Sequence, residues 1–563
     1  TLIKSMRYTS LIFLSLIFSL SALSQEFTYS DRLRVNLSEF RSFYDVYYYD
    51  LDVTVDDQQQ KIINSYNNIH IKALSNFQTI QIDLFENLKI HSIQFEHKKL
   101  EFQRIHNAVF INFPRLIYEN EKISFKVLYS GKPRVAVNPP WDGGFSWEKD
   151  NNGNSWVGVS CQGLGASSWW PCKDHQSDEP DSMKITSTVR YPLQVISNGK
   201  KKSDKTFFSE ELQSKANKSS WYVSYPINNY NVTLCIGDYK YFNDIHINNF
   251  DTLELDYYVL KYNYNKARDH FQQVNPMLEC FEKYFGPYPF YKDGYTLIET
   301  PYLGMEHQSA IAYGNNYLPG YNGNKQFIAG LDFDYIIVHE TGHEWWGNSI
   351  TTNDIADMWI HEGFCTYSEV LYVECIYGYD IMLKYVNNQK RSVRNDKPII
   401  GPYNVNKKGS NDMYQKGSLM LHTLRNLIDN DSLWFSIIKG ISEEFKYKIV
   451  DGIEIINYIN EKIDLDLYYF FKQYLNNADI PIFEYKIQKN GRGSTLLYRW
   501  NAINDFNMNI KVNIGQQDLW LSPDSEWKEH GLGNTDIKSF NCLLYTSDAA
   551  DEGLGVDLGG RRI

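Results

Sequence analysis

The sequence predicts an α+β protein of several domains, in which a β domain, a mostly helical domain and a small β domain follow one another. Three observations support this fold class. The chain has 563 residues, 43% of them hydrophobic, which is enough for more than one core. Up to about residue 245, apolar and polar residues alternate with period two within short segments. Apolar residues then recur at helical spacing to about residue 479, and alternation returns after that.

The chain begins with a segment that is typical of a secretory signal peptide. Met6 and Arg7 precede an apolar run from Leu11 to Leu23, which is too short to span a membrane and ends in the small residues of "ALSQ". We therefore expect residues 1–24 to be a signal, with residues 1–5 upstream of its start. The protein is expected to be exported, either to a periplasm or out of the cell. No second apolar run approaches membrane-spanning length, so we expect no integral membrane segment in the mature chain.

The first folded part, residues 25–245, is expected to be an antiparallel β domain. Its apolar residues alternate with polar ones over short runs that are separated by polar turns, as in a half-buried sheet. The clearest runs are "YDLDVTV" (49–55), "IHI" (69–71), "IQIDL" (80–84) and "KISFKVLY" (122–129).

The second part, residues 246–479, is expected to be mostly helical. Its first helix, over 264–286, ends at Gly286-Pro287, a pair that stops helices. Further helical periods cover 332–346, 360–377, 411–429, 434–445 and 452–476.

The last part, residues 480–541, returns to alternation in "FEYKIQ", "LLYRW" and "MNIKVNI" and predicts a small, truncated β domain of the sandwich type. Residues 542–563 differ in composition from the rest of the chain, and we interpret them as a non-native tail.

Charge and cysteine content restrict the function classes. The net charge of −12 argues against a nucleic-acid surface, because phosphate binding requires a basic patch. The seven cysteines form no CxxC pair and are too sparse for a disulfide framework, so most of them are expected to be small buried residues.

One motif indicates a metal site. In "HETGHEWWGN" (339–348), His339 and His343 are four residues apart, so a helix places both imidazoles on one face, where they can reach a single ion. Glu340 follows the first histidine and can lean over the open side of that ion. The apolar "FDYIIV" precedes the motif, so these polar groups enter a core, where they would be costly to bury without a partner. The alternative is a polar helix face beside two tryptophans.

A catalytic zinc ion requires a third protein ligand and an open position for water. Glu362 in "WIHEGF" is the best candidate, since eighteen residues separate it from His343 and a second, antiparallel helix would bring it back to the metal. His361 is adjacent, but successive helical residues point about 100° apart, so only one of the two can face the ion. The pattern alone leaves this choice open.

Together these motifs resemble the zinc aminopeptidases of the membrane-alanyl aminopeptidase and leukotriene hydrolase type, which are gluzincin metallopeptidases. The resemblance covers about residues 45–535 and implies a thermolysin-like catalytic domain with one zinc ion on His339, His343 and Glu362. It also implies that Glu369 orients a ligand imidazole from outside the coordination sphere.

The same resemblance assigns the residues that hold a substrate's free amine. "YLGMEHQSAIAYG" (302–314) is similar to the family's Gly-Ala-Met-Glu-Asn motif, so Glu306 matches the amine-binding glutamate, while Leu303 and His307 depart from the pattern. Gln162 in "CQGLGASSWWPC" matches a second amine-binding position. Tyr414 in "DMYQKGS" matches a tyrosine that donates to the oxyanion.

The function expected from the resemblance is hydrolysis of the N-terminal residue of peptides through a zinc-activated water, with Glu340 as the general base. Two alternatives remain, a thermolysin-type zinc endopeptidase and a non-catalytic peptide-binding zinc protein. Glu306 and Gln162 argue against the first, and Glu340 with Tyr414 argues against the second. An epoxide hydrolase side activity, known in one branch of the family, also stays open, as do the preferred N-terminal residue and the oligomeric state.

Overall fold

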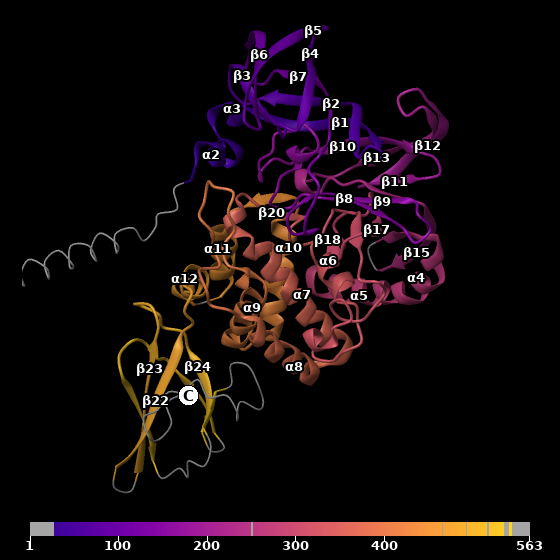
Figure 1. The fold of residues 1–563 in the computed structure, drawn as a ribbon. Coiled ribbons are helices and arrows are strands. Elements are labelled where there is room, and N and C mark those ends of the chain that lie inside the picture. Colours follow the sequence, from indigo (N-terminus) through magenta and orange to yellow (C-terminus); the bar gives the residue numbers. More distant parts are fainter. Residues whose placement is uncertain are drawn as a thin grey trace, which may run out of the picture.

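The structure is a computed structural model that describes residues 27–248, 251–463, 465–490, 493–514, 517–533 and 540–542. Along the chain it forms an N-terminal β part, a mostly helical part and a small C-terminal β part (Figure 1). This order confirms the predicted α+β fold class. The domain boundaries given above stay predictions. The expected signal, residues 1–24, lies outside the described residues, as does the expected tail apart from its first residue.

The N-terminal part is built on a ten-stranded sheet with the order β12-β13-β10-β1-β2-β7-β4-β5-β6-β3. Buried residues alternate along β2 and β7, as period-two patterning predicts. The described pairs are antiparallel except for β1 with β10, which run parallel. A four-stranded sheet, β11-β14-β9-β8, contributes to the same hydrophobic core. The elements are α2 (Tyr29–Val35), α3 (Glu39–Ser42), β1 (Tyr44–Asp56), β2 (Lys61–Ala73), β3 (Phe77–Asp83), β4 (Leu88–Phe95), β5 (Lys98–Ile105), β6 (Ala108–Ile117), β7 (Lys122–Gly131), β8 (Gly144–Lys149), β9 (Ser155–Ser160), β10 (Ser182–Arg190), β11 (Gln194–Ile196), β12 (Lys200–Ser209), β13 (Ser214–Val223) and β14 (Cys235–Gly237).

The middle part combines a five-stranded sheet, in the order β15-β16-β17-β19-β18, with a group of helices. Each of the six predicted helical segments contains a helix. The first is interrupted by a 3₁₀ turn at Phe271–Gln273, and the last is divided into two helices. The elements are β15 (Tyr239–Ile247), β16 (Thr252–Leu260), α4 (Tyr264–His270), α5 (Val274–Phe285), β17 (Tyr295–Glu299), β18 (Gly304–Met305), β19 (Ile311–Tyr313), α6 (Tyr335–Gly342), β20 (Ile350–Thr352), α7 (Trp359–Tyr377), α8 (Tyr379–Gln389), α9 (Gln415–Ile428), α10 (Asp431–Glu444), β21 (Lys448–Val450), α11 (Gly452–Lys462) and α12 (Tyr468–Asn476).

The C-terminal part contains two three-stranded sheets, ordered β22-β23-β26 and β25-β24-β27, which agrees with the expected small β domain. None of the described helices is both long and apolar enough to span a membrane. The strands are β22 (Ile482–Asn490), β23 (Gly493–Asn501), β24 (Ile510–Ile514), β25 (Gln517–Leu521), β26 (Lys528–Gly533) and β27 (Phe540–Cys542).

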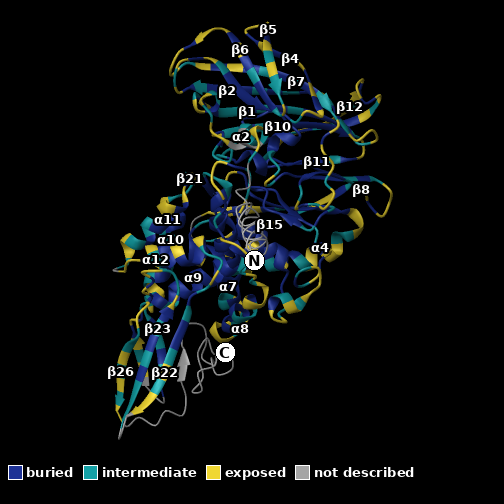
Figure 2. Ribbon diagram, turned by 60° about the vertical axis from the view of Figure 1, so that its left-hand side comes forward, coloured by how far each residue is buried: buried dark blue, intermediate teal, exposed yellow. Residues whose placement is uncertain are grey.

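The five-stranded sheet lies between two hydrophobic cores. Leu297 and Ile311 pack with the helices, whereas Ile298, Tyr302 and Met305 pack with the core of the N-terminal part. Strand β18 therefore runs along the junction of the two parts, beside helix α6 (Figure 1). Helix α7 is largely buried (Figure 2). This placement lets residues from both parts meet at one site.

A disulfide joins the helices α5 and α7. Cys280 and Cys375 are bonded across a sequence separation of 95 residues, whereas Cys161, Cys172, Cys235 and Cys365 are free and buried. The four free cysteines agree with the expectation of small buried residues. The disulfide was not predicted, because no sequence spacing relates two cysteines so far apart.

Removal of this disulfide is expected to destabilise the helical part. A cross-link that closes a loop of this size typically contributes about 2–5 kcal/mol to the free energy of unfolding. Thermal unfolding of a Cys280→Ser/Cys375→Ser double variant should therefore occur at a lower temperature than in the wild type. Reductant should lower the wild-type transition and leave that of the variant where it is. An equal effect of reductant on both proteins would contradict the prediction.

Candidate metal centre and active site

The helix that carries the two histidines is fixed firmly at its start. Asp334 caps α6 by accepting hydrogen bonds from the N–H groups of Ile336 (3.0 Å) and Ile337 (3.4 Å). Its carboxylate also accepts from the Tyr313 hydroxyl (2.7 Å) and contacts the His270 ring nitrogen Nε2 (2.7 Å). One turn after the cap, the helix therefore presents His339 and His343 from a rigid support.

Helix α7 brings the third donor to these two imidazoles. Glu362 Oε2 lies 3.6 Å from His339 Nε2 and 3.4 Å from His343 Nε2. Donors at about 2.0–2.1 Å from a tetrahedral zinc ion are about 3.3 Å apart, so these separations fit one ion bound by all three residues. Glu362 Oε2 is also fully buried and accepts no conventional hydrogen bond among the described residues, which a bound cation would remedy.

The tautomers of both histidines suit metal binding. His339 Nδ1 donates to Glu369 Oε1 (2.7 Å), and His343 Nδ1 donates to the main-chain oxygen of Trp346 (2.9 Å). Each imidazole therefore keeps its Nε2 lone pair for a metal. Of the two tryptophans after the motif, Trp346 thus contributes its carbonyl, and its ring stacks on Phe364.

A second set of possible donors shares the two histidines. His339, His343 and Cys365 have ligand atoms within 4.8 Å of one another. The Cys365 thiol, however, donates to the main-chain oxygen of His339 (2.7 Å), whereas Glu362 Oε2 has no such partner among the described residues. We therefore assign Glu362 as the third donor.

His361, the alternative third ligand that the pattern left open, faces elsewhere. Its Nε2 accepts a hydrogen bond from the Thr352 N–H (3.0 Å) in strand β20. Burial, assisted by the neighbouring His343, lowers the pKa of His361 to about 3, so the ring is neutral. Its role is to hold β20 against the start of α7.

Glu340 lies next to the donor set and beside strand β18. A Cβ atom on Gly304 would come within 2.8 Å of Glu340 Oε1 and 2.6 Å of Ile336 Cγ2, so only glycine leaves room for this carboxylate. Burial raises the pKa of Glu340 to about 7, while His339 opposes the rise. A carboxyl with such a pKa can both take up and release a proton near neutral pH.

Tyr414, at the start of α9, reaches the same centre. Its hydroxyl donates to Glu362 Oε1 (2.9 Å), and its ring stacks on His339 with centroids 6.0 Å apart. Burial, and then the charge of Glu362, hold the pKa of Tyr414 well above its usual value, so the phenol remains a proton donor.

Glu306 forms the other end of the site. Its Oε1 accepts from Gln162 Nε2 and from the Tyr230 hydroxyl (3.2 Å), and only 3% of the residue is exposed. Its carboxylate, that of Glu340 and a ring nitrogen of His343 lie within 4.8 Å of one another. The structure therefore brings the eight sequence-predicted residues into one connected cluster, with Glu369 behind His339.

The two departures from the family motif have different surroundings. Leu303 is partly buried and packs against the helical core, and its carbonyl accepts from the Gly314 N–H (2.7 Å). His307 is fully buried, and its two ring nitrogens find no hydrogen-bond partner among the described residues. Burial lowers its pKa to about 3, so it is present as a neutral ring.

Two tyrosines of the cluster were missed by sequence reasoning. Tyr230 holds Glu306, and Tyr385 donates to Glu369 Oε2 (2.5 Å) from helix α8. Neither lies in a motif, and the chain has 43 tyrosines, so no sequence signal distinguishes them.

Replacement of Glu369 by Gln is expected to weaken zinc binding about 10- to 100-fold, because groups behind a metal ligand fix its tautomer and basicity. Competition with a chromogenic chelator would measure this affinity. Tyr385→Phe, which leaves the Glu369–His339 contact in place, should have a smaller effect. A Glu369→Gln protein with wild-type zinc affinity would show that Glu369 only fills space.

Comparisons with known proteins agree with this geometry. Residues 270–474 match the peptidase family M1 domain. Endoplasmic reticulum aminopeptidase 1 of Mus musculus is 24% identical over 193 residues, which are 32% of this chain and 21% of that protein. Probable aminopeptidase 1 of Sulfurisphaera tokodaii is 22% identical over 271 residues, which are 44% of this chain and 34% of that protein. These alignments thus span about a fifth and a third of the two relatives.

A solved structure extends the comparison over most of the fold. The crystal structure of a mutant M1 zinc metallopeptidase from Deinococcus radiodurans, bound to a Tyr-Ser-Ala substrate, superposes with a TM-score of 0.64 at 18% identity. The match covers 78% of this chain and 96% of that one. Together with the family match of residues 270–474, this shared fold confirms the resemblance inferred from the motifs: this part of the chain is similar to the peptidase family M1 domain, and the fold is that of an M1 zinc metallopeptidase.

Proposed function

We propose that the protein is a zinc-dependent aminopeptidase that removes the N-terminal residue from peptides. One observation carries the proposal. The Glu306 carboxylate, held by Gln162 and Tyr230, lies within 4.8 Å of ligand atoms of both Glu340 and His343. A buried carboxylate at that distance can bind the terminal ammonium of a substrate while the carbonyl of the substrate's first residue lies beside the metal donors.

The metal and the side chains have separate tasks. Zinc held by His339, His343 and Glu362 would supply Lewis acidity toward the carbonyl and the attacking water. Glu340 takes the proton from that water and passes it to the leaving amine. Tyr414 donates its hydroxyl hydrogen to the oxyanion that forms on the former carbonyl.

The amine-binding end argues for an exopeptidase. An endopeptidase must pass substrate chain through this position, yet Glu306 is almost fully buried and would have to accept an uncharged peptide group in place of a cation. Glu306 and Gln162 therefore restrict cleavage to the first peptide bond. The intact Glu340 and Tyr414 also argue against a protein that only binds peptides.

A fluorogenic assay tests the proposal. The zinc-loaded protein is expected to cleave aminoacyl-coumarin substrates with a free amine, to spare their N-acetylated counterparts and to lose activity with a chelator. Cleavage of blocked internal peptides would identify an endopeptidase. Zinc binding without any turnover would indicate a binding protein. The Tyr-Ser-Ala substrate of the Deinococcus relative supports peptides as the substrate class.

We also propose that the protein is exported. The disulfide between Cys280 and Cys375 supports this, because disulfides persist mainly in oxidising compartments. Mass spectrometry of protein recovered from the periplasm or medium should find a mature chain that starts near residue 25. Retention of the uncut chain in the cytoplasm would contradict it.

A further inference from the structure

An open cavity of about 50 Å³ borders the end of the site where Glu306 lies. Two of its lining residues adjoin the amine-binding pair. Gly163 follows Gln162, and the Tyr230 hydroxyl donates to Glu306. From the other side it is lined by Asp354 and Ile355, which follow β20. A Cβ atom on Gly163 would lie 3.9 Å from Ile355 Cδ1, so the missing side chain leaves space between the two walls.

The position of the cavity indicates which part of a substrate enters it. It touches the residues around the amine-binding pair but is not lined by the metal donors, Glu340 or Tyr414. In an N-terminal residue, the amine and the side chain leave the same Cα, whereas the rest of the peptide leaves through the carbonyl. A cavity beside the amine site and away from the carbonyl site therefore suits the first side chain.

The lining of the cavity is polar. Apart from Ile355 and the Tyr230 ring, it consists of glycines, amides, His175 and charged groups. The charged groups are Arg34, Asp174 and Asp354. Arg34 comes from helix α2 and donates to the Gly163 carbonyl (2.9 Å). A large apolar side chain would form no hydrogen bond with this lining and would displace water from its polar groups, so it is disfavoured.

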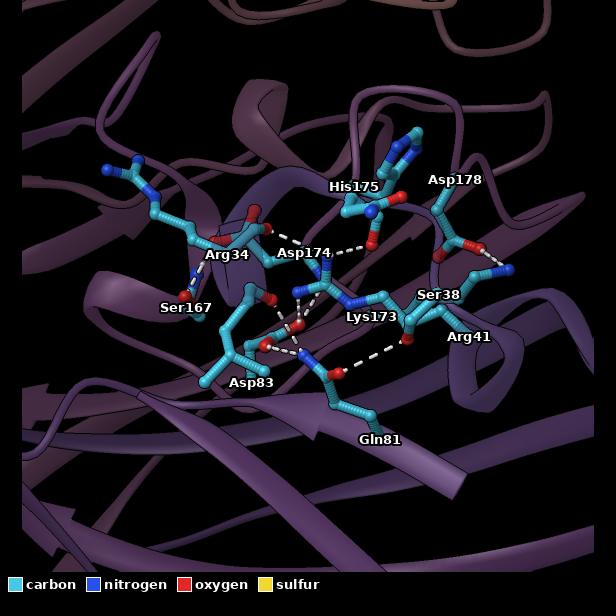
Figure 3. Close-up of polar contacts among 12 residues, drawn as sticks. Arg34, Ser38, Arg41, Gln81, Asp83, Ser167, Lys173, Asp174, His175 and Asp178 are labelled. Carbon is cyan, nitrogen blue, oxygen red and sulfur yellow. Dashed lines mark hydrogen bonds and ion pairs between the residues drawn. The ribbon is translucent and has the colours of Figure 1, made fainter. Parts of the chain in front are cut away.

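The carboxylates on the two walls differ in their surroundings. Asp174 accepts from the Ser167 hydroxyl (2.5 Å) and from the N–H groups of Ala166 and Ser167 (both 3.1 Å), as part of the network in Figure 3. It also shares the space beside Gly165 with Arg34, whose positive charge offsets its own.

Asp354 has no such compensation. It accepts only main-chain N–H groups, from Ala356 (2.9 Å) and Asn404 (2.8 Å), and no described lysine or arginine forms an ion pair with it. Burial raises its pKa, and the charge of Asp451 adds to the rise. Each of its oxygens keeps a lone pair that a cation can use.

We propose that this cavity receives the side chain of the substrate's N-terminal residue and selects a basic side chain, that of arginine or lysine, through Asp354. This proposal rests on the aminopeptidase function proposed above. The formal charge of the lining is negative, because two carboxylates face one guanidinium. An acidic first residue would have to pair with Arg34 beside two carboxylates, which is the less favourable arrangement.

Aminoacyl-coumarins of Arg, Lys, Leu and Glu, assayed with the zinc-loaded protein, test the proposal. The value of kcat/KM for Arg and Lys should exceed that for Leu by about tenfold, the usual size of one charge-assisted hydrogen bond. Asp354→Asn should lower the Arg-to-Leu ratio by about the same factor. Asp380→Asn is the control, since Asp380 is an exposed aspartate at the start of α8 that does not line the cavity, and it should leave the ratio unchanged.

A binding measurement on the wild type keeps the proposal testable if the variant does not fold. Titration calorimetry should find tighter binding of L-arginine than of L-leucine. A preference for Leu, or an Arg-to-Leu ratio unaffected by Asp354→Asn, would overturn the proposal, and a preference for Glu would assign selection to Arg34. Cleavage of none of the substrates contradicts the aminopeptidase function itself, whereas chelator-sensitive cleavage with an apolar preference contradicts only the assignment of the cavity.

Discussion

Replacement of Glu340 by Gln is expected to lower kcat by up to about 10⁴-fold while the protein keeps its zinc. Gln has the same shape, so it fits the space beside Gly304, but it cannot accept a proton from water. Glu340 is not among the metal donors, so metal content should stay near that of the wild type. The measurements are kcat with a free-amine substrate and zinc content by mass spectrometry.

A glutamate just beyond the end of the same helix offers a matched control. Glu344 is also buried, and burial raises its pKa to about 7, as it does for Glu340. It faces away from the metal donors, however, and accepts from the Tyr288 hydroxyl (2.6 Å) and the Ser309 N–H (3.0 Å). Glu344→Gln should therefore affect stability more than kcat. Near-normal turnover in Glu340→Gln would exclude this glutamate as the general base.

The sequence was informative where function depends on local spacing. His339 and His343 share a helix face because a helix turns every 3.6 residues, and this relation holds without knowledge of the fold. The order of β and helical parts likewise follows from periodicity. The choice between His361 and Glu362 required the family resemblance. In the structure, both residues lie at the start of α7, but His361 points to Thr352 and Glu362 points to the two imidazoles.

Contacts between distant segments could not be predicted. Tyr230 and Glu306 are 76 positions apart and meet only because the N-terminal part packs on strand β18. The Cys280–Cys375 disulfide depends in the same way on how α5 and α7 pack. Helix α8 was missed because its polar sequence, "YDIMLKYVNNQ", shows a weak apolar pattern, yet it supplies Tyr385 to the metal centre.

The parallel pairing of β1 with β10 was missed for a related reason. Alternating burial identifies a strand and the face it buries, but it does not identify the strand's neighbour or their relative direction. Val53 of β1 aligns with Ser187 of β10 in a sheet whose other described pairs are antiparallel. Only the long connection between the two strands, which carries Gln162 and one wall of the cavity with Gly163 and Asp174, permits this arrangement.

Replacement of Tyr414 by Phe is expected to lower kcat about 10²- to 10³-fold with little change in KM, the usual cost of losing one donor to a developing oxyanion. The phenyl ring can keep its stacking on His339, so the loss is confined to the hydroxyl. Steady-state kinetics with a free-amine substrate measures both constants. Tyr335→Phe is the control, because its ring also stacks on His339 (5.3 Å) but its hydroxyl lies near Nδ1, away from the metal side.

The hydroxyl of Tyr414 also donates to Glu362 Oε1, so a second role must be separated from the first. If the tyrosine acted only by orienting Glu362, Tyr414→Phe would weaken zinc binding, and excess zinc would restore kcat. If it donates to the oxyanion, zinc affinity changes little and excess zinc restores nothing. Burial and the charge of Glu362 keep the pKa of this phenol high, so the donor stays protonated around neutral pH. The loss in kcat should therefore persist from pH 6 to pH 8, and a loss confined to one end of that range would point to a titrating group in place of a fixed donor.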